Sequence, residues 1–181
     1  MTTLEYAKQE LKKYYKKVTG TGNCNINLIL SDKIKEFDDE IQIDVVKGQG
    51  KITGSNERSV LIGVYKFFYE LGCRFVRPGA DGEIIVKVSP ENCSVKKNFY
   101  PKSRYRAVCC EGAVSEENVI DMVEWLPKIG MNSYFTQFVD GHLFFEKWYK
   151  HKGSSVIEPE EYSVEESRKH YKNVVEAIKK C

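Results

Sequence analysis

Acidic, imidazole and aromatic side chains are mixed in the segment 139–151, which gives this part of the sequence the side chains best suited to bind a ligand. Aromatic faces can stack on the apolar C–H faces of sugars, and aspartate and histidine can hydrogen-bond their hydroxyl groups. The segment opens a connection of about two dozen residues, and connections of that length often carry function. We therefore expect it to bind substrate, with the candidates Asp140, His142, Trp148 and His151.

Two other interpretations apply to the same segment. Phe144, Phe145 and Trp148 would pack against the core if they lie together on a helical turn. A metal site is disfavoured, because the acidic and imidazole side chains match no standard ligand spacing. We expect neither a metal nor a cofactor.

The six cysteines are expected to be free thiols. None forms a CxxC pair, and no cysteine and histidine group has zinc-finger spacing. Cys109 and Cys110 would point to opposite faces of a strand, which disfavours a chelating pair. A thiol nucleophile beside His142 would need surroundings that lower the thiol pKa, and nothing in the sequence indicates them. The cysteines are Cys24, Cys73, Cys93, Cys109, Cys110 and Cys181.

Two further candidates flank one predicted strand, 104–110. The guanidinium of Arg106 could donate a fork of hydrogen bonds to two sugar hydroxyls, or it could pair with a carboxylate of the protein. Glu111 follows the strand and could accept from a sugar hydroxyl. Alternatively, Glu111 is a loop carboxylate stabilised by the dipole of the next helix.

Elements that could position these residues begin with a first half of mixed helical and strand patterns. Thr2 and Glu5 match a capping box, and Gly20 is a helix stop. Strict alternation around a glycine-containing turn predicts a hairpin. The predicted elements are a helix over 2–20, strands over 25–30 and 41–46, a turn over 47–50, a returning strand over 51–54, a helix over 57–71, strands over 73–76 and 82–87, and an aperiodic linker over 88–103.

The second half has the pattern β-α-β-loop-α, which is typical of a parallel α/β structure. Ser115 caps a helix in which Pro127 loosens the last turn, and Ser163 with Glu166 forms a second capping box. The predicted elements are strands over 104–110 and 133–138, a helix from 115 to about 129, and a last helix from 163 to the chain end.

Composition excludes several classes of protein. The chain has 181 residues, 41% of them apolar and 30% charged, which suits a globular protein with a real core. The net charge is only +2, so bulk charge favours neither a nucleic acid nor a membrane partner. No apolar run has the length of a membrane span, and the first residues lack a signal-peptide pattern. We expect a cytoplasmic chain.

The stretch 51–68 carries a signature of spaced small and apolar residues. It resembles the pattern I-x-I-x-(G/A)-x-x-x-x-G-x-x-x-G-x-x-x-(L/F) of the small α/β domain that precedes the catalytic barrel in β-N-acetylhexosaminidases and α-glucuronidases. Gly54 and Gly63 match, whereas Ser59 stands where the pattern usually has glycine. The continuation 70–75 also fits.

A second stretch, 105–113, resembles the first barrel strand of the same enzymes, and 125–132 resembles the end of the first barrel helix. In the resemblance, Arg106 matches the arginine that reaches sugar hydroxyls, with Arg104 as an alternative. The pair Glu111–Gly112 is similar to the first strand of a second N-acetylglucosaminidase family, which acts on protein-linked sugar.

The resemblance implies an α/β fold in which a mixed sheet with packed helices is followed by the first βα units of an incomplete (β/α)₈ barrel. We assign the N-terminal domain to 1–98, a linker to 99–103 and the barrel start to 104–181. A full barrel needs about 250 residues, and the resembled enzymes carry their acidic pair at the fourth strand. The expected function is therefore an N-terminal piece of a glycoside hydrolase that binds carbohydrate without catalysing its hydrolysis.

An alternative class is a non-catalytic module that binds a glycan or a protein. In either case, a truncated barrel would leave strand edges and apolar faces unpaired. We therefore also expect self-association between chains.

Overall fold

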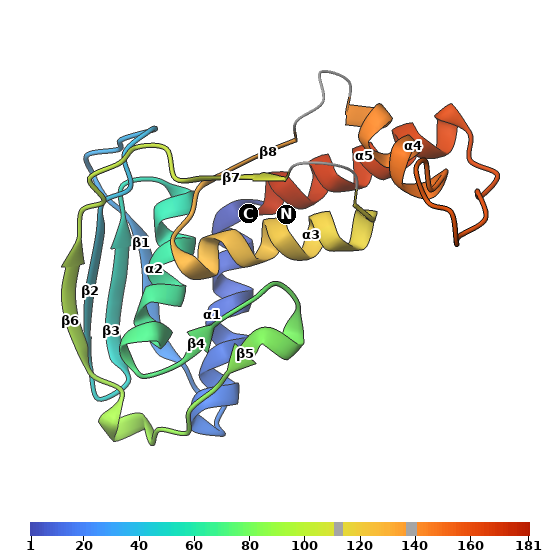
Figure 1. Cartoon of the computed structure of the whole chain (residues 1–181). Coiled ribbons are helices and arrows are strands. Elements are labelled where there is room, and N and C mark those ends of the chain that lie inside the picture. The colour runs from blue at the N-terminus through green and yellow to red at the C-terminus, as the bar shows by residue number, and fades with distance from the viewer. Residues whose placement is uncertain (111–113, 137–140) are drawn as a thin grey trace.

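The computed structural model describes residues 1–110, 114–136 and 141–181 as a mixed α/β protein. A four-stranded sheet is covered on one face by α2, against which α1 packs, and a second group of elements lies beside these helices (Figure 1). The helices are α1 (Thr3–Thr19), α2 (Glu57–Glu70), α3 (Glu116–Trp125), α4 (Gly141–Tyr149) and α5 (Val164–Lys180), with short 3₁₀ helices at Ala80–Gly82, Pro90–Asn92 and Leu126–Ile129. The strands are β1 (Asn25–Leu30), β2 (Ile41–Val46), β3 (Gln49–Gly54), β4 (Arg74–Phe75), β5 (Glu83–Ile84), β6 (Val95–Phe99), β7 (Ala107–Cys110) and β8 (Ser133–Thr136).

The main sheet has the order β1-β3-β2-β6. Strand β1 runs parallel to β3, while β2 is antiparallel to both β3 and β6. The predicted hairpin is confirmed, but its turn is tighter than the predicted 47–50. Only Lys47 and Gly48 form the turn, with φ of 50° and 73°, which is typical of a two-residue hairpin.

Helix α2 lies unusually close to the sheet at Gly63. Ile41, Ile43 and Ile52 point from β2 and β3 into the core and are almost fully buried. A Cβ atom added to Gly63 would lie 2.7 Å from the Cγ2 of Ile52 and 3.0 Å from that of Ile41. The absence of a side chain therefore sets the distance between helix and sheet.

Two of the sequence predictions in the first half are wrong in extent. The predicted linker 88–103 contains the 3₁₀ helix Pro90–Asn92 and strand β6, which pairs with β2 along the edge of the sheet. Strand β6 has one buried side chain, Val95, so its sequence carries little alternation. The predicted strand 82–87 is reduced to the two residues of β5, which pair with the equally short β4.

The second half confirms the predicted parallel pair. Strands β7 and β8 are parallel in a register that runs from Ala107↔Ser133 to Cys110↔Thr136, and α3 connects them. Strand β7 begins at Ala107 rather than at residue 104, and α4 occupies part of the predicted long connection. Both predicted caps are present, at Ser115 and as a capping box at Ser163.

Two sequence expectations concern the chain as a whole. All six cysteines are free thiols in the structure, as expected. Within the described ranges, no helix is both long enough and apolar enough to cross a membrane.

The close approach of α2 gives a stability prediction. Gly63→Ala should lower the free energy of unfolding by about 1–2 kcal/mol, because the added methyl group meets β-branched side chains that are fixed to the sheet. The matched control is Gly22→Ala, whose added Cβ would have nothing within 4 Å. Urea denaturation followed by circular dichroism measures both. Equal midpoints for the two variants would contradict the close packing.

Candidate functional site

Both strands of the parallel pair end at the same edge of their sheet. Strand β7 ends at Cys110 and β8 at Thr136, and α4 begins at Gly141, five residues after β8. In parallel α/β proteins, ligands bind beyond the carboxyl ends of the strands. The predicted residues Glu111 and Asp140 lie outside the described residues.

Arg106 lies at the opposite end of β7, just before the strand begins. Its Nε donates to the carbonyl of Gly130 at 2.7 Å, and its Nη1 donates to the carbonyl of Ser103 at 2.8 Å. Its Nη2 lies 2.5 Å from the carboxylate of Asp39. Only 16% of the side chain is exposed. The structure therefore favours the alternative in which Arg106 pairs with a protein carboxylate, and it argues against the predicted contact with sugar.

Asp39 is the centre of a buried polar cluster that the sequence did not single out. Its side chain is fully buried, and its oxygens accept from the guanidinium groups of Arg58 and Arg106, from the hydroxyl of Ser59 at 2.9 Å and from Nδ2 of Asn132 at 2.9 Å. Burial alone would raise the pKa of Asp39, but the hydrogen bond from Arg106 and the charge of Arg58 outweigh it and hold the pKa below its ordinary value. The carboxylate is therefore structural rather than poised to transfer a proton.

No sequence signal could have identified Asp39. It lies in an aperiodic stretch between β1 and β2, and its partners are 17 to 93 residues away along the chain. Only the folded chain brings them to one carboxylate.

A second buried carboxylate, Glu83, has a comparable role. Its oxygens accept from the ammonium groups of Lys17 at 2.7 Å and Lys128 at 2.9 Å, and from the hydroxyl of Tyr14. These donors overcome the effect of burial and lower the pKa of Glu83 to about 2. Since Lys17 lies on α1 and Lys128 follows α3, Glu83 also joins the two halves of the chain.

The predicted residues on and after α4 are divided between its two ends. His142 is half-buried near the start of α4, and its carbonyl accepts from the hydroxyl of Ser167 on α5. Trp148 and His151 meet at the other end, with ring centroids 6.3 Å apart. Phe145 lies between and is buried against α3 and α5, so the core-packing alternative is confirmed for that aromatic residue.

Of the six predicted binding residues, the structure brings only Trp148 and His151 together within the described ranges. Arg106 lies at the wrong end of β7, and His142 is separated from Trp148 by most of α4. The four described candidates therefore do not form a single site. Within the same ranges, no group of acidic, histidine and cysteine side chains is arranged to hold a metal ion.

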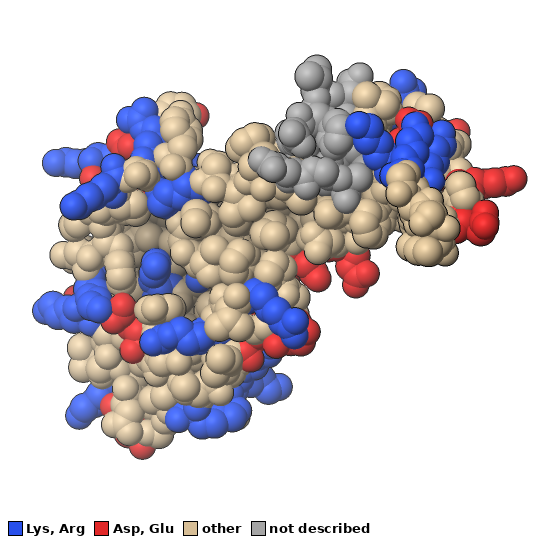
Figure 2. Space-filling view, in the orientation of Figure 1, with Lys and Arg blue, Asp and Glu red and all other residues tan. Residues whose placement is uncertain are grey.

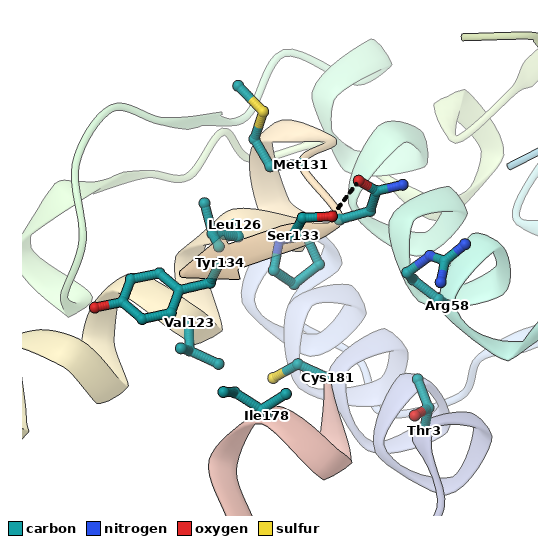
Figure 3. Close-up of a pocket in the computed structure, with 11 residues that line it drawn as sticks. Thr3, Arg58, Val123, Leu126, Met131, Ser133, Tyr134, Ile178 and Cys181 are labelled. Atoms are coloured by element: carbon teal, nitrogen blue, oxygen red, sulfur yellow. Dashed lines mark hydrogen bonds between the residues drawn. The ribbon is translucent and has the colours of Figure 1, made fainter. Parts of the chain in front are cut away.

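A pocket of about 270 Å³ lies between α1, α3, β8 and the end of α5 (Figure 3). Apolar side chains, including Tyr134 and Ile178, form most of its wall, and Arg58 and Asn132 supply polar groups that Asp39 already engages. Burial raises the pKa of the Cys181 thiol in its wall to about 12. The thiol is therefore protonated at neutral pH and is no nucleophile there.

Comparison with known proteins places the chain in no family. No family model matches the sequence, and no curated protein matches it. One similar solved structure is described as "Family 89 Glycoside Hydrolase from Clostridium perfringens in complex with PUGNAc". It aligns with 91% of this chain at 15% identity and a TM-score of 0.47, and this chain spans 19% of that chain.

Asp39→Asn should weaken both the fold and its dependence on pH. Removing one charge leaves Arg58 and Arg106 without their anion, which should cost about 3 kcal/mol at neutral pH. Because the pKa of Asp39 is lower in the folded chain than its ordinary 3.8, its stabilisation is present above that value and is lost as acid protonates the carboxylate.

The measurement is the urea midpoint of both proteins between about pH 6 and pH 3. The difference in urea midpoint between the unchanged protein and Asp39→Asn should become smaller as the pH falls. A gap that stays constant over this range would contradict the assignment. Asp81→Asn, which removes an exposed carboxylate paired with Arg77, is the matched control and should change the midpoint little.

Proposed function

We propose that this chain is the N-terminal part of a carbohydrate-active enzyme of the glycoside hydrolase type. In this proposal, residues 1–98 form an accessory α/β domain and residues 104–181 supply the first two βα units of a (β/α)₈ barrel. The observation that carries the proposal is the parallel pair β7–β8, which the described residues cover with helices on one face only.

The two faces of this pair differ in their surroundings. Cys110 and Tyr134 are partly buried and pack against the small cluster that α3, α4 and α5 form. On the other face, Cys109 and Phe135 lie side by side in the strand register, and both are exposed, Phe135 by 54%. Parallel sheets are ordinarily covered on both faces. In a barrel, helices cover the outer face and side chains from the other strands fill the inner one. The bare face fits the inner side of such a barrel.

The structure also explains why the signature in 51–68 contains small residues at fixed positions. It spans β3 and α2, and its small residues lie where strand and helix touch. A Cβ added to Gly54 would lie 2.5 Å from the backbone nitrogen of Val60, and Gly63 faces Ile52. Ser59, which replaces the usual glycine, uses its hydroxyl to bond to Asp39 at 2.9 Å. The departure from the pattern therefore belongs to the polar cluster at Asp39.

Charge on the surface is compatible with an uncharged ligand. Figure 2 shows basic and acidic side chains interspersed on the visible face, with uncharged surface across the middle of the molecule. A polyanionic partner such as a nucleic acid usually requires a continuous basic surface instead.

The proposal predicts that hydrolysis requires strands beyond the two in this sequence. This chain should not hydrolyse aryl N-acetylglucosaminides or aryl glucuronides, whereas the protein encoded by the complete reading frame should hydrolyse one of them. Alanine in place of the acidic pair at the fourth barrel strand of that longer protein should abolish hydrolysis. The circular dichroism spectrum of this variant should match that of the unchanged protein. A reading frame that ends at Cys181, or a complete protein with no turnover of any glycoside, would overturn the proposal.

The bare face also predicts self-association of the isolated chain. Sedimentation velocity at tens of micromolar should show dimers or larger species, because Phe135 and the unpaired strand edges are exposed. Phe135→Asp should shift the distribution toward the monomer, whereas Val46→Asp, at a similarly exposed position of β2, should not. A monomeric profile of the unchanged chain would contradict the prediction.

A further inference from the structure

We propose that the end of α4 carries a carbohydrate-binding platform made of Trp148, His151 and Glu160, separate from the strand ends of the barrel. The choice of carbohydrate as ligand rests on the proposed function. The location and the residues rest on the geometry of this segment.

The indole of Trp148 is the exposed aromatic surface of the platform, and the side chain of His151 beside it is 16% exposed. Trp148 lies in the last turn of α4, with 39% of its surface exposed. The amide of His151 donates to the carbonyl of Trp148 at 2.9 Å, and the carbonyl of His151 accepts from Ser154 at 2.9 Å. These bonds hold His151 at φ 46°, a left-handed conformation that is uncommon outside glycine. The turn places the imidazole beside the indole at an angle of 64°.

A carboxylate completes the platform. Nε2 of His151 lies 3.0 Å from Oε1 of Glu160, and the amide of Glu160 donates to the carbonyl of Tyr149 at 3.3 Å. The side chain of Glu160 is 57% exposed, so its carboxylate can accept from a ligand while it contacts His151. An indole surface, an imidazole and a carboxylate are thus fixed next to each other by contacts within 148–160.

This combination suits a neutral, hydroxyl-rich ligand. A sugar ring offers an apolar C–H face to the indole, and its hydroxyls can donate to the exposed carboxylate of Glu160, which His151 holds in place. The nearby ammonium groups of Lys150 and Lys152 lie 3.0 Å and 3.6 Å from Glu146. Since that carboxylate partly neutralises them and Glu160 adds a negative charge, the surroundings do not favour an anionic ligand.

The platform is distinct from the edge where the strands end. Trp148 is seven positions after Gly141, the first residue of α4. Since a helix rises about 1.5 Å per residue, the two lie about 10 Å apart along the helix axis. In Figure 1, α4 lies at the end of the molecule farthest from the main sheet. A ligand held there would be an additional contact for a long glycan rather than the bond that is cleaved.

The two tryptophans of this chain provide a direct test by NMR. Neutral oligosaccharides, namely N-acetylglucosamine oligomers and cello-oligosaccharides, are titrated into the ¹⁵N-labelled chain to millimolar concentration. The indole N–H signal of Trp148 should shift in a saturable manner with at least one of them. The signal of Trp125 should stay in place, because its indole nitrogen is bonded to the carbonyl of Phe75 at 2.9 Å and serves as the internal control.

Variants then separate a binding role from a structural one. Trp148→Ala should weaken binding roughly tenfold or more, as removal of a central aromatic contact does, with an unchanged unfolding midpoint. Trp148→Phe should retain part of the affinity. Tyr100→Ala removes an aromatic side chain that is 65% exposed on the other half of the chain, and it should bind like the unchanged protein.

Three results would overturn the platform: no shift of the Trp148 signal with either series, equal binding by Trp148→Ala, or protection of Trp148 by a protein partner and by no sugar. The proposed function can fail independently, because it is tested by hydrolysis in the longer protein. Sugar binding at Trp148, together with no hydrolysis of any glycoside by the longer protein, would support the platform and overturn only the proposed enzyme.

Discussion

The carboxylate of Asp39 is the interaction on which the arrangement of the two halves depends. A charge buried among protein atoms is tolerated only when it is paired and hydrogen-bonded. Asp39 meets this requirement with Arg58 and Ser59 from α2 and with Arg106 and Asn132 from the ends next to β7 and β8. Glu83 adds a second clamp between α1 and the segment after α3. The main sheet and the parallel pair are therefore joined by these polar contacts and by the packing of Trp125, Ile129 and Cys181 against the core of the first half, and the indole of Trp125 also donates to the carbonyl of Phe75.

The position of this clamp decides which end of the parallel pair is available for function. Arg106 and Asn132 precede β7 and β8, so the amino ends of both strands are fixed to Asp39 in the first half of the chain. The carboxyl ends point away from it, toward the segments that lead to α3 and α4. Parallel α/β proteins bind their ligands at the carboxyl ends of their strands, which are the ends that point away from the Asp39 cluster here. Arg106 lies at the amino end of β7, where its guanidinium is already engaged by Asp39 and by the carbonyl of Gly130.

Helix α4 extends the molecule beyond the parallel pair (Figure 1). Phe145 anchors it to α3 and α5, so its start stays near the strand ends while Trp148 is carried outward. In the proposed function, a glycan chain with its repeated apolar faces and hydroxyls would contact the platform at the tip of α4 in addition to the site at the strand ends. Adding a second contact to the same ligand raises affinity without changing the chemistry at the first.

The amino-acid sequence by itself determined the elements whose signals are local. Helices α1, α3 and α5 begin at the predicted caps, and the hairpin β2–β3 and the β-α-β pattern are present, because caps, turns and periodicity depend on residues close in sequence. Tertiary structure alone decided the rest. Strand β6 forms because β2 offers an edge, and Asp39, without a sequence signal, becomes central because Arg106 and Asn132 reach it from far along the chain. The pairing with this distant carboxylate favours the structural alternative for Arg106 over a contact with sugar, because a buried carboxylate is tolerated only when it is paired and hydrogen-bonded.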